Sequence, residues 1–212
     1  MTWDVWITYA IACTILLAVP GPTIMLVITH ALTKGRRSGF YTVPGVILGD
    51  TAALILSLAG LGAILAYSAS LFTVVKLIGA GYLIYLGIQL WRAKVDGGPA
   101  LTESNGAGSK DGWALGAHAF AVTTLNPKGI VFFIAFLPQF VDQDGPILLQ
   151  LTILGGTFVV LGGLNAAIYA YLAGSFSKFL GSTYWRRIIN RGGGGFLIGA
   201  GVMMAVAMRR SS

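Results

Sequence analysis

Charged side chains are scarce in this chain, because Asp, Glu, Lys and Arg together make up only 10% of its 212 residues. Soluble domains contain about 25% of them. Hydrophobic residues make up 56% of the chain, more than a soluble core of this length can bury, so we expect lipid to be the solvent. Six long apolar runs are present: Val5–His30, Phe40–Ala66, Leu71–Trp91, Trp113–Val141, Ile147–Ala173 and Gly193–Met208. A helix needs about 20 such residues to cross a bilayer, and lipid favours helices over open sheets. The sequence predicts an all-α integral membrane protein with six transmembrane helices in one domain, residues 1–212.

Cysteine and histidine are equally rare. Cys13 is the only cysteine, so the thiol–disulfide chemistry of a membrane electron carrier is excluded. His30 and His118 are far apart in the sequence, whereas soft and borderline metals bind clusters of Cys, His and Met. We therefore expect no metal site and no cofactor, and we expect His30 at the surface. Because no Walker-type phosphate loop is present, ATP is not indicated as the energy source, and the chain is predicted to be a transporter rather than an enzyme.

Basic residues are absent from the start of the chain, where Lys34 is the first. The first segment therefore resembles a retained helix more than a signal peptide. Most Lys and Arg residues fall in three alternate connections: Lys34, Arg36 and Arg37; Arg92, Lys94 and Lys110; Lys178, Arg186, Arg187 and Arg191. Basic loops stay in the cytoplasm, so both termini are predicted to face outward, although Arg209 and Arg210 oppose this for the last helix. This distribution argues against nucleic acid as a partner despite the net charge of +7.

The two halves of the chain share an ordered pair of motifs. Pro20-Gly21-Pro22 precedes Ile47–Thr51, and Asn126-Pro127-Lys128 precedes Ile153–Thr157 at the same separation. Because each half holds three helices, an odd number, the halves must insert in opposite orientations as inverted repeats. We place repeat one at about 1–92, a flexible linker at about 93–112 and repeat two at about 113–212.

Both motifs interrupt an apolar run. Proline removes a backbone donor, and Gly21 permits unusual dihedral angles, so helices 1 and 4 are predicted to be broken; a simple kink is the alternative. Half-helix ends suit an amino-acid zwitterion, since an N-terminus favours a carboxylate and a C-terminus an ammonium. The expected translocation site contains Pro20, Gly21, Pro22, Asn126, Pro127 and Lys128.

Asp50 lies about ten residues into helix 2, near the middle of the bilayer. A carboxylate at that depth is costly and usually functional, so Asp50 is the candidate for the coupling proton. The alternative is a structural role, with Asp50 satisfied by Thr51 or by a cation. Lys128 is the expected partner, although the sequence leaves open whether the two pair directly. Asn165 is expected to line a polar cavity or to join helices.

Glycines are expected to let helices approach closely at Gly45, Gly49, Gly79, Gly195 and Gly199. The run Gly192–Gly195 is expected to form a flexible start to helix 6.

Several of these motifs, in this order, resemble the LysE/RhtB family of amino-acid exporters. They are Pro20-Gly21-Pro22, Gly45-xxx-Gly49-Asp50, Lys76-xx-Gly79-xx-Tyr82-Leu83, and Asn126-Pro127-Lys128 followed by Phe132-Phe133 and Phe136–Val141. The resemblance implies a proton-driven exporter of amino acids or their derivatives in the bacterial cytoplasmic (inner) membrane, surrounded by lipid and often a homodimer. It leaves the substrate open. The alternatives are a heavy-metal cation exporter of the same superfamily and an exporter of another small metabolite.

Overall fold

The computed structural model describes residues 1–67, 69–93, 112–142, 144–173 and 182–210, and this part of the chain is helical without a strand. The prediction of an all-α protein is therefore confirmed. Most of the expected linker lies outside the described residues. The elements are α1 (Trp3–Ala18), α2 (Pro22–Lys34), η1 (Arg36–Ser38), α3 (Gly39–Tyr67), α4 (Ala69–Arg92), α5 (Gly112–Thr124), α6 (Pro127–Val131), η2 (Phe132–Phe136), η3 (Leu137–Phe140), α7 (Ile147–Tyr171) and α9 (Thr183–Arg210).

Several of these helices are long and apolar enough to cross a membrane. Arg36–Leu61 and Ile147–Tyr171 qualify as single helices. Two bent pairs also qualify when each is counted as one span: α1 with α2, bent by 54°, and α5 with Pro127–Phe140, bent by 43°. Length and composition thus give up to four spans in the described residues. The six-span count stays a prediction, because it also needs α4 and α9.

Both helix breaks lie where the two motifs predict them. Gly21 caps α2 and Asn126 caps α6, and in each case a proline, Pro22 or Pro127, opens the second half-helix. Proline suits this position because the first turn of a helix has no partner for the missing N–H. In the structure Pro22 is therefore equivalent to Pro127. The aligned sequence motifs instead place Pro22 opposite Lys128, which is one residue later. Gly21 has φ −106° and ψ −171°, which any residue adopts, so the expectation of unusual dihedral angles there was wrong.

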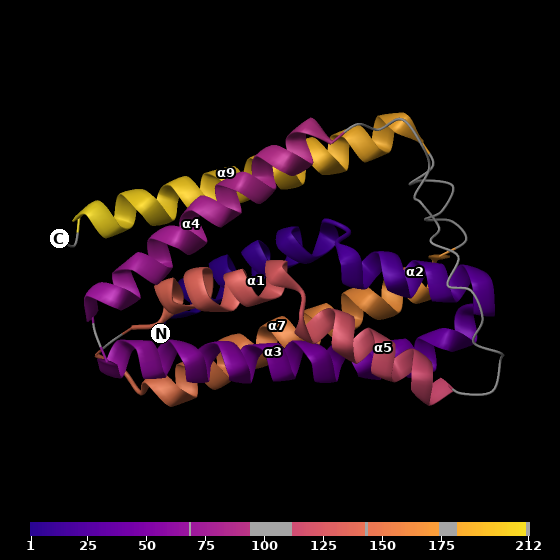
Figure 1. The fold of residues 1–212 in the computed structure, drawn as a ribbon, viewed down its shortest axis with the longest axis horizontal. Coiled ribbons are helices and arrows are strands. Elements are labelled where there is room, and N and C mark those ends of the chain that lie inside the picture. The colour runs from indigo at the N-terminus through magenta and orange to yellow at the C-terminus, as the bar shows by residue number, and fades with distance from the viewer. Residues whose placement is uncertain (68, 94–111, 143, 174–181, 211–212) are drawn as a thin grey trace.

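The helices form two groups around the breaks (Figure 1). The helix α3 packs along α5 and α7, α1 packs against α7, and α4 packs along α9. Both termini lie at the left-hand end of the view, whereas the junction of α2 with α3 and the start of α9 lie at the right-hand end. The basic segments Lys34–Arg37 and Arg187–Arg191 thus lie at the end opposite the termini. This is the arrangement that the predicted outward termini require.

Glycines on α3 and α4 allow close contact with the second half of the chain. A Cβ atom at Gly49 would lie 2.9 Å from the carbonyl oxygen of Phe120, and one at Gly45 would meet the backbone of α5. A Cβ atom at Gly79 would lie 2.6 Å from the Cβ of Ala135. These separations are shorter than side chains tolerate, so the three glycines serve helix packing.

The glycine run of the last helix differs from expectation. Gly192–Gly195 lies inside α9 and is helical. A Cβ atom at Gly194 would come within 2.6 Å of the carbonyl oxygen of Gly87, and one at Gly195 within 3.3 Å of the Trp91 ring. The run therefore lets α9 approach α4 instead of forming a flexible start. Gly199 faces open space, with nothing within 4 Å of its Cβ position, so the structure gives it no packing role.

The helices α2 and α5 pack against each other. His30 on α2 is only 6% exposed, and its ring centroid lies 5.7 Å from that of His118 on α5. The expectation that His30 lies at the surface was therefore wrong. Its helix packs against the second half of the chain, which the sequence pattern alone does not reveal.

Aromatic side chains fix the second broken span against the first. Phe132 and Phe133 of η2 pack against Phe158 of α7, with ring centroids 5.1 and 4.7 Å apart. Tyr9 of α1 packs on Phe132 and on Phe140 at 6.0 and 5.1 Å. Because such rings pack in rigid offset or edge-on geometries, this cluster positions η2 between α1 and α7, directly beside the breaks.

Candidate functional site between the two helix breaks

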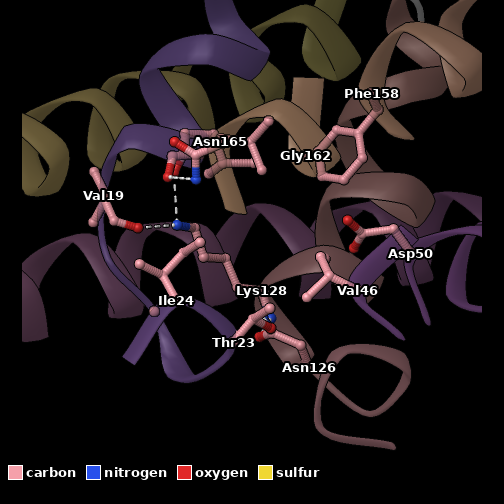
Figure 2. A pocket seen from close by; sticks show the side chains of 14 residues that line it. Val19, Thr23, Ile24, Val46, Asp50, Asn126, Lys128, Phe158, Gly162 and Asn165 are labelled. Atoms are coloured by element: carbon pink, nitrogen blue, oxygen red, sulfur yellow. Dashed lines mark hydrogen bonds between the residues drawn. The ribbon is translucent and has the colours of Figure 1, made fainter. Parts of the chain in front are cut away.

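The cation of Lys128 lies on the end of α1. Its Nζ atom donates hydrogen bonds to the carbonyl oxygens of Leu16, at 2.6 Å, and Val19, at 2.8 Å (Figure 2). The break at Pro20 removes the N–H bonds that a continuing helix would give these carbonyls, although Leu16 still accepts the N–H of Val19 at 3.3 Å, and lipid cannot supply further donors. Lys128 therefore caps the negative end of α1 from the opposite half of the chain, where a cation is also favoured by the helix dipole.

Two side chains of α7 bond to the two carbonyls that lie between those of Leu16 and Val19. Asn165 donates from Nδ2 to the carbonyl oxygen of Leu17 at 3.1 Å, and Tyr169 donates from Oη to that of Ala18 at 3.0 Å. The two residues are four positions apart and so lie on one face of the helix. The carbonyls of four consecutive residues, 16 to 19, are thus all bonded by side chains of the second half.

The second break is joined to the first through Thr23. Asn126 accepts a hydrogen bond from the backbone N–H of Lys128 at Oδ1, at 3.1 Å, and donates from Nδ2 to Thr23 Oγ1 at 3.1 Å. Thr123 donates to the same hydroxyl oxygen at 3.3 Å. Thr23 is buried, so these bonds hold the two breaks in direct contact.

A small cavity lies between the breaks and α3. Its volume is about 40 Å³, which is room for about three water molecules. It is lined by Leu16, Leu17, Val19, Gly21, Thr23, Ile24, Val46, Asp50, Asn126, Lys128, Gly129, Phe158, Gly162 and Asn165. Pro20, Pro22 and Pro127 do not line it. The site predicted from the sequence is therefore brought together, with the prolines shaping the chain around it.

Asp50 lies across this cavity from Lys128 (Figure 2). Its side chain is 8% exposed. Within the described residues the one ion pair closer than 4.0 Å joins the amino terminus of Met1 to Asp142, so Asp50 and Lys128 share a cavity without pairing directly. The hydroxyl of Thr51 donates to the carbonyl oxygen of Ile47 at 2.7 Å, and so it does not satisfy the Asp50 carboxylate.

Gly162 is a site residue that the sequence reasoning missed. A Cβ atom at this position would lie 2.7 Å from Oδ2 of Asp50, so its absence makes room for the carboxylate. Thr23 was missed as well. The available signal for Gly162 was its spacing three residues before Asn165, which places both on one face of α7.

Comparison with known proteins identifies the family. Residues 14–208 match the sequence model of the LysE type translocator family. The chain belongs to this family. A LysE-family member is a membrane-embedded transporter, not an enzyme. This confirms the prediction of a membrane protein and the prediction of a transporter.

Named relatives span the whole length of this LysE-family chain. It is 32% identical to an uncharacterized membrane protein of Vibrio cholerae over 98% of this chain and 99% of that protein. It is 31% identical to the homoserine/homoserine lactone efflux protein of Salmonella typhi over 98% of both chains, and equally to that of Salmonella typhimurium. No solved structure matches the chain.

The fit of Asp50 against α7 in this LysE-family member can be tested at Gly162. We expect Gly162→Ala to reduce transport about tenfold, because the added methyl group displaces the carboxylate, a change of about 1.4 kcal/mol in the barrier. The nearest atom belongs to a rotatable side chain, so thermal stability should change little. Gly156→Ala is the matched control, because nothing lies within 4 Å of that position on the same helix. Equal transport by both variants would show that the carboxylate position is unimportant.

Proposed function

We propose that this LysE-family member is a secondary exporter in the bacterial inner membrane that moves small neutral amino acids or their derivatives outward in exchange for protons. The observation that carries the proposal is the placement of Asp50 and Lys128 in one cavity between two broken helices. Intramembrane ionisable groups commonly mark substrate and ion pathways, and discontinuous helices form the substrate sites of many secondary transporters.

The charges lining the cavity suit a zwitterion. They consist of one carboxylate, on Asp50, and one ammonium group, on Lys128, so a molecule with one group of each sign adds no net charge. A basic amino acid would bring a further cation, and none of the lining residues offers it a second carboxylate. The names of the Salmonella relatives make homoserine, which is a zwitterion, the first substrate to test, and homoserine lactone, which lacks the carboxylate, its comparison.

Asp50 is proposed to carry the coupling proton. Its carboxylate has no ion-pair partner within 4.0 Å among the described residues, and a buried, unpaired charge is unfavourable. Loading a proton from outside and releasing it inside would let the same group alternate between neutral and charged forms during the cycle.

The proposed transport cycle requires the cavity to open alternately. At about 40 Å³ the cavity holds a few water molecules, so the helices around it must move apart to admit an amino acid. The helix contacts support the inverted repeat as the basis of that opening. In such a repeat α1 corresponds to α5, α2 to η3 and α3 to α7. The contact of α2 with α5 then corresponds to that of α1 with η3, and the contact of α3 with α5 corresponds to that of α1 with α7. Homodimer formation stays a prediction of the family resemblance.

The test is efflux from proteoliposomes loaded with radiolabelled homoserine. An acidic exterior should accelerate efflux, and a proton ionophore should abolish the acceleration; vesicles without protein give the background. Parallel vesicles contain homoserine lactone, lysine or a non-amino-acid metabolite. Export of lysine but not of homoserine would contradict the proposed substrate class, and efflux that ignores the gradient would contradict proton exchange.

A further inference from the structure

A second hollow lies beside the cavity that Asp50 and Lys128 line. It is a groove of about 370 Å³ between the helix breaks, the C-terminal part of α4 and one residue of α9. Its walls are mostly apolar. The lining residues are Val19, Pro20, Gly21, Pro22, Leu86, Gln89, Leu90, Ala93, Asn126, Pro127, Lys128 and Leu197.

The groove and the cavity are separated by a single layer of residues. Val19, Gly21, Asn126 and Lys128 line both of them. Lys128 crosses this layer, because it begins on the second break and its ammonium group bonds to the carbonyl oxygens at the end of α1. Releasing these hydrogen bonds would join the two spaces, so we call these four residues the septum.

The groove lies toward the basic end of the molecule. Gln89 and Ala93 lie within one turn of Arg92, the last residue of α4. Because basic segments stay on the cytoplasmic side, the groove opens toward the compartment from which an exporter takes its substrate.

We propose that this groove is the cytoplasmic access vestibule of the transporter and that the septum is its inner gate. The inference rests on the proposed function and assigns it a route. The occupant is the exported zwitterion, whose side chain lies against Leu86, Leu90 and Leu197 while its charged end meets Gln89 and Lys128. The groove is large enough for a molecule of this size; its polar residues Asn126 and Lys128 line the wall that it shares with the cavity, and Gln89 lies on α4.

Paired cysteine variants test the vestibule in a Cys13→Ala parent. Leu86→Cys and Gln89→Cys place a thiol in the groove. Their controls are Tyr85→Cys and Ile88→Cys, each one residue earlier at similar depth but on exposed positions outside the groove. Inside-out and right-side-out membrane vesicles are treated with a membrane-impermeant maleimide, with and without homoserine.

We expect the groove thiols to react from the cytoplasmic face at least about tenfold faster than the controls, because a thiol in lipid stays protonated and unreactive. Homoserine should slow their reaction and leave that of the controls unchanged. If the groove thiols react no faster than the controls, lipid fills the groove and the proposal is overturned. Reaction of these thiols only from the opposite face would also overturn it. Homoserine export by the Cys13→Ala parent is measured first. If the parent exports homoserine and the groove thiols remain unprotected, the vestibule is wrong while the function stands. If the wild-type protein, measured alongside, exports nothing, the proposed function is wrong.

Discussion

Replacing Asp50 by asparagine should reduce proton-driven efflux to less than about 1% of the wild-type rate, because the one carboxylate in the cavity is then lost. Asparagine has nearly the same size, so it fits against Gly162, but it cannot load and release a proton. The measurement is initial efflux of labelled homoserine from proteoliposomes under an imposed pH gradient. Asp50→Glu should retain part of the activity, since it keeps the carboxyl group in a tighter space.

Loss of transport through misfolding must be separated from loss of coupling. The Asp50→Asn variant should insert normally and keep the thermal stability of the wild type, because the carboxylate makes no ion pair closer than 4.0 Å among the described residues. It should also still exchange internal for external homoserine when no gradient is applied, since exchange needs no net proton movement. Normal gradient-driven efflux by this variant would remove Asp50 from the coupling mechanism.

Of the variants considered, Lys128→Met should lower the thermal stability of the protein the most. The variant removes the two hydrogen bonds to the carbonyl oxygens of Leu16 and Val19. Bonds to charged groups contribute about 1.5–3 kcal/mol each, and after the substitution the carbonyl of Leu16 would keep only the N–H of Val19. Tyr169→Phe is the matched control, because it removes one neutral bond to the same helix end and should cost about 1 kcal/mol. Thermal unfolding in detergent compares the two.

The same Lys128 variants distinguish capping from two other roles. If Lys128 bound the substrate carboxylate, Lys128→Gln would raise the KM for homoserine with little change in stability. If it balanced the charge of Asp50, the pH profile of efflux would shift instead. Capping predicts lower stability first, with partial rescue by Lys128→Arg, which keeps a cationic donor. A Lys128→Met protein as stable as Tyr169→Phe would contradict the capping role.

The features that the sequence predicted correctly are those with strong local causes. Proline at positions 20, 22 and 127 removes backbone N–H donors, and lipid offers no water to bond the carbonyls that lose them. Both breaks therefore lie where the motifs place them. The internal repeat predicted that the breaks meet, and the depth of Asp50 placed it at the same level. These inferences needed only residue type, spacing and the thickness of the bilayer.

The sequence could not predict which group Lys128 bonds to, because the Asp50 carboxylate and the carbonyls at the end of α1 compete for it. Asp50 was the obvious choice by charge, but a broken α1 also presents carbonyls that can accept further hydrogen bonds, and these have no sequence signature of their own. The rotation of each helix about its axis decides which partner is within reach, and it is set by packing contacts such as those of Gly49 and Gly162. His30 is buried where α2 meets α5, and Gly192–Gly195 is helical where α9 packs along α4.

The capping of α1 also fixes the order in which the protein can be completed during its synthesis. The end of α1 is made early, whereas every side chain that bonds its last four carbonyls belongs to α6 or α7. The ribosome therefore delivers an unfinished helix end to the membrane more than 100 residues before Lys128 is made, counting from Leu16. Until the later segments arrive, those carbonyls must be hydrated at the membrane surface or held by the insertion machinery. The end of α1 therefore gains its full set of side-chain bonds only after α6 and α7 have been made.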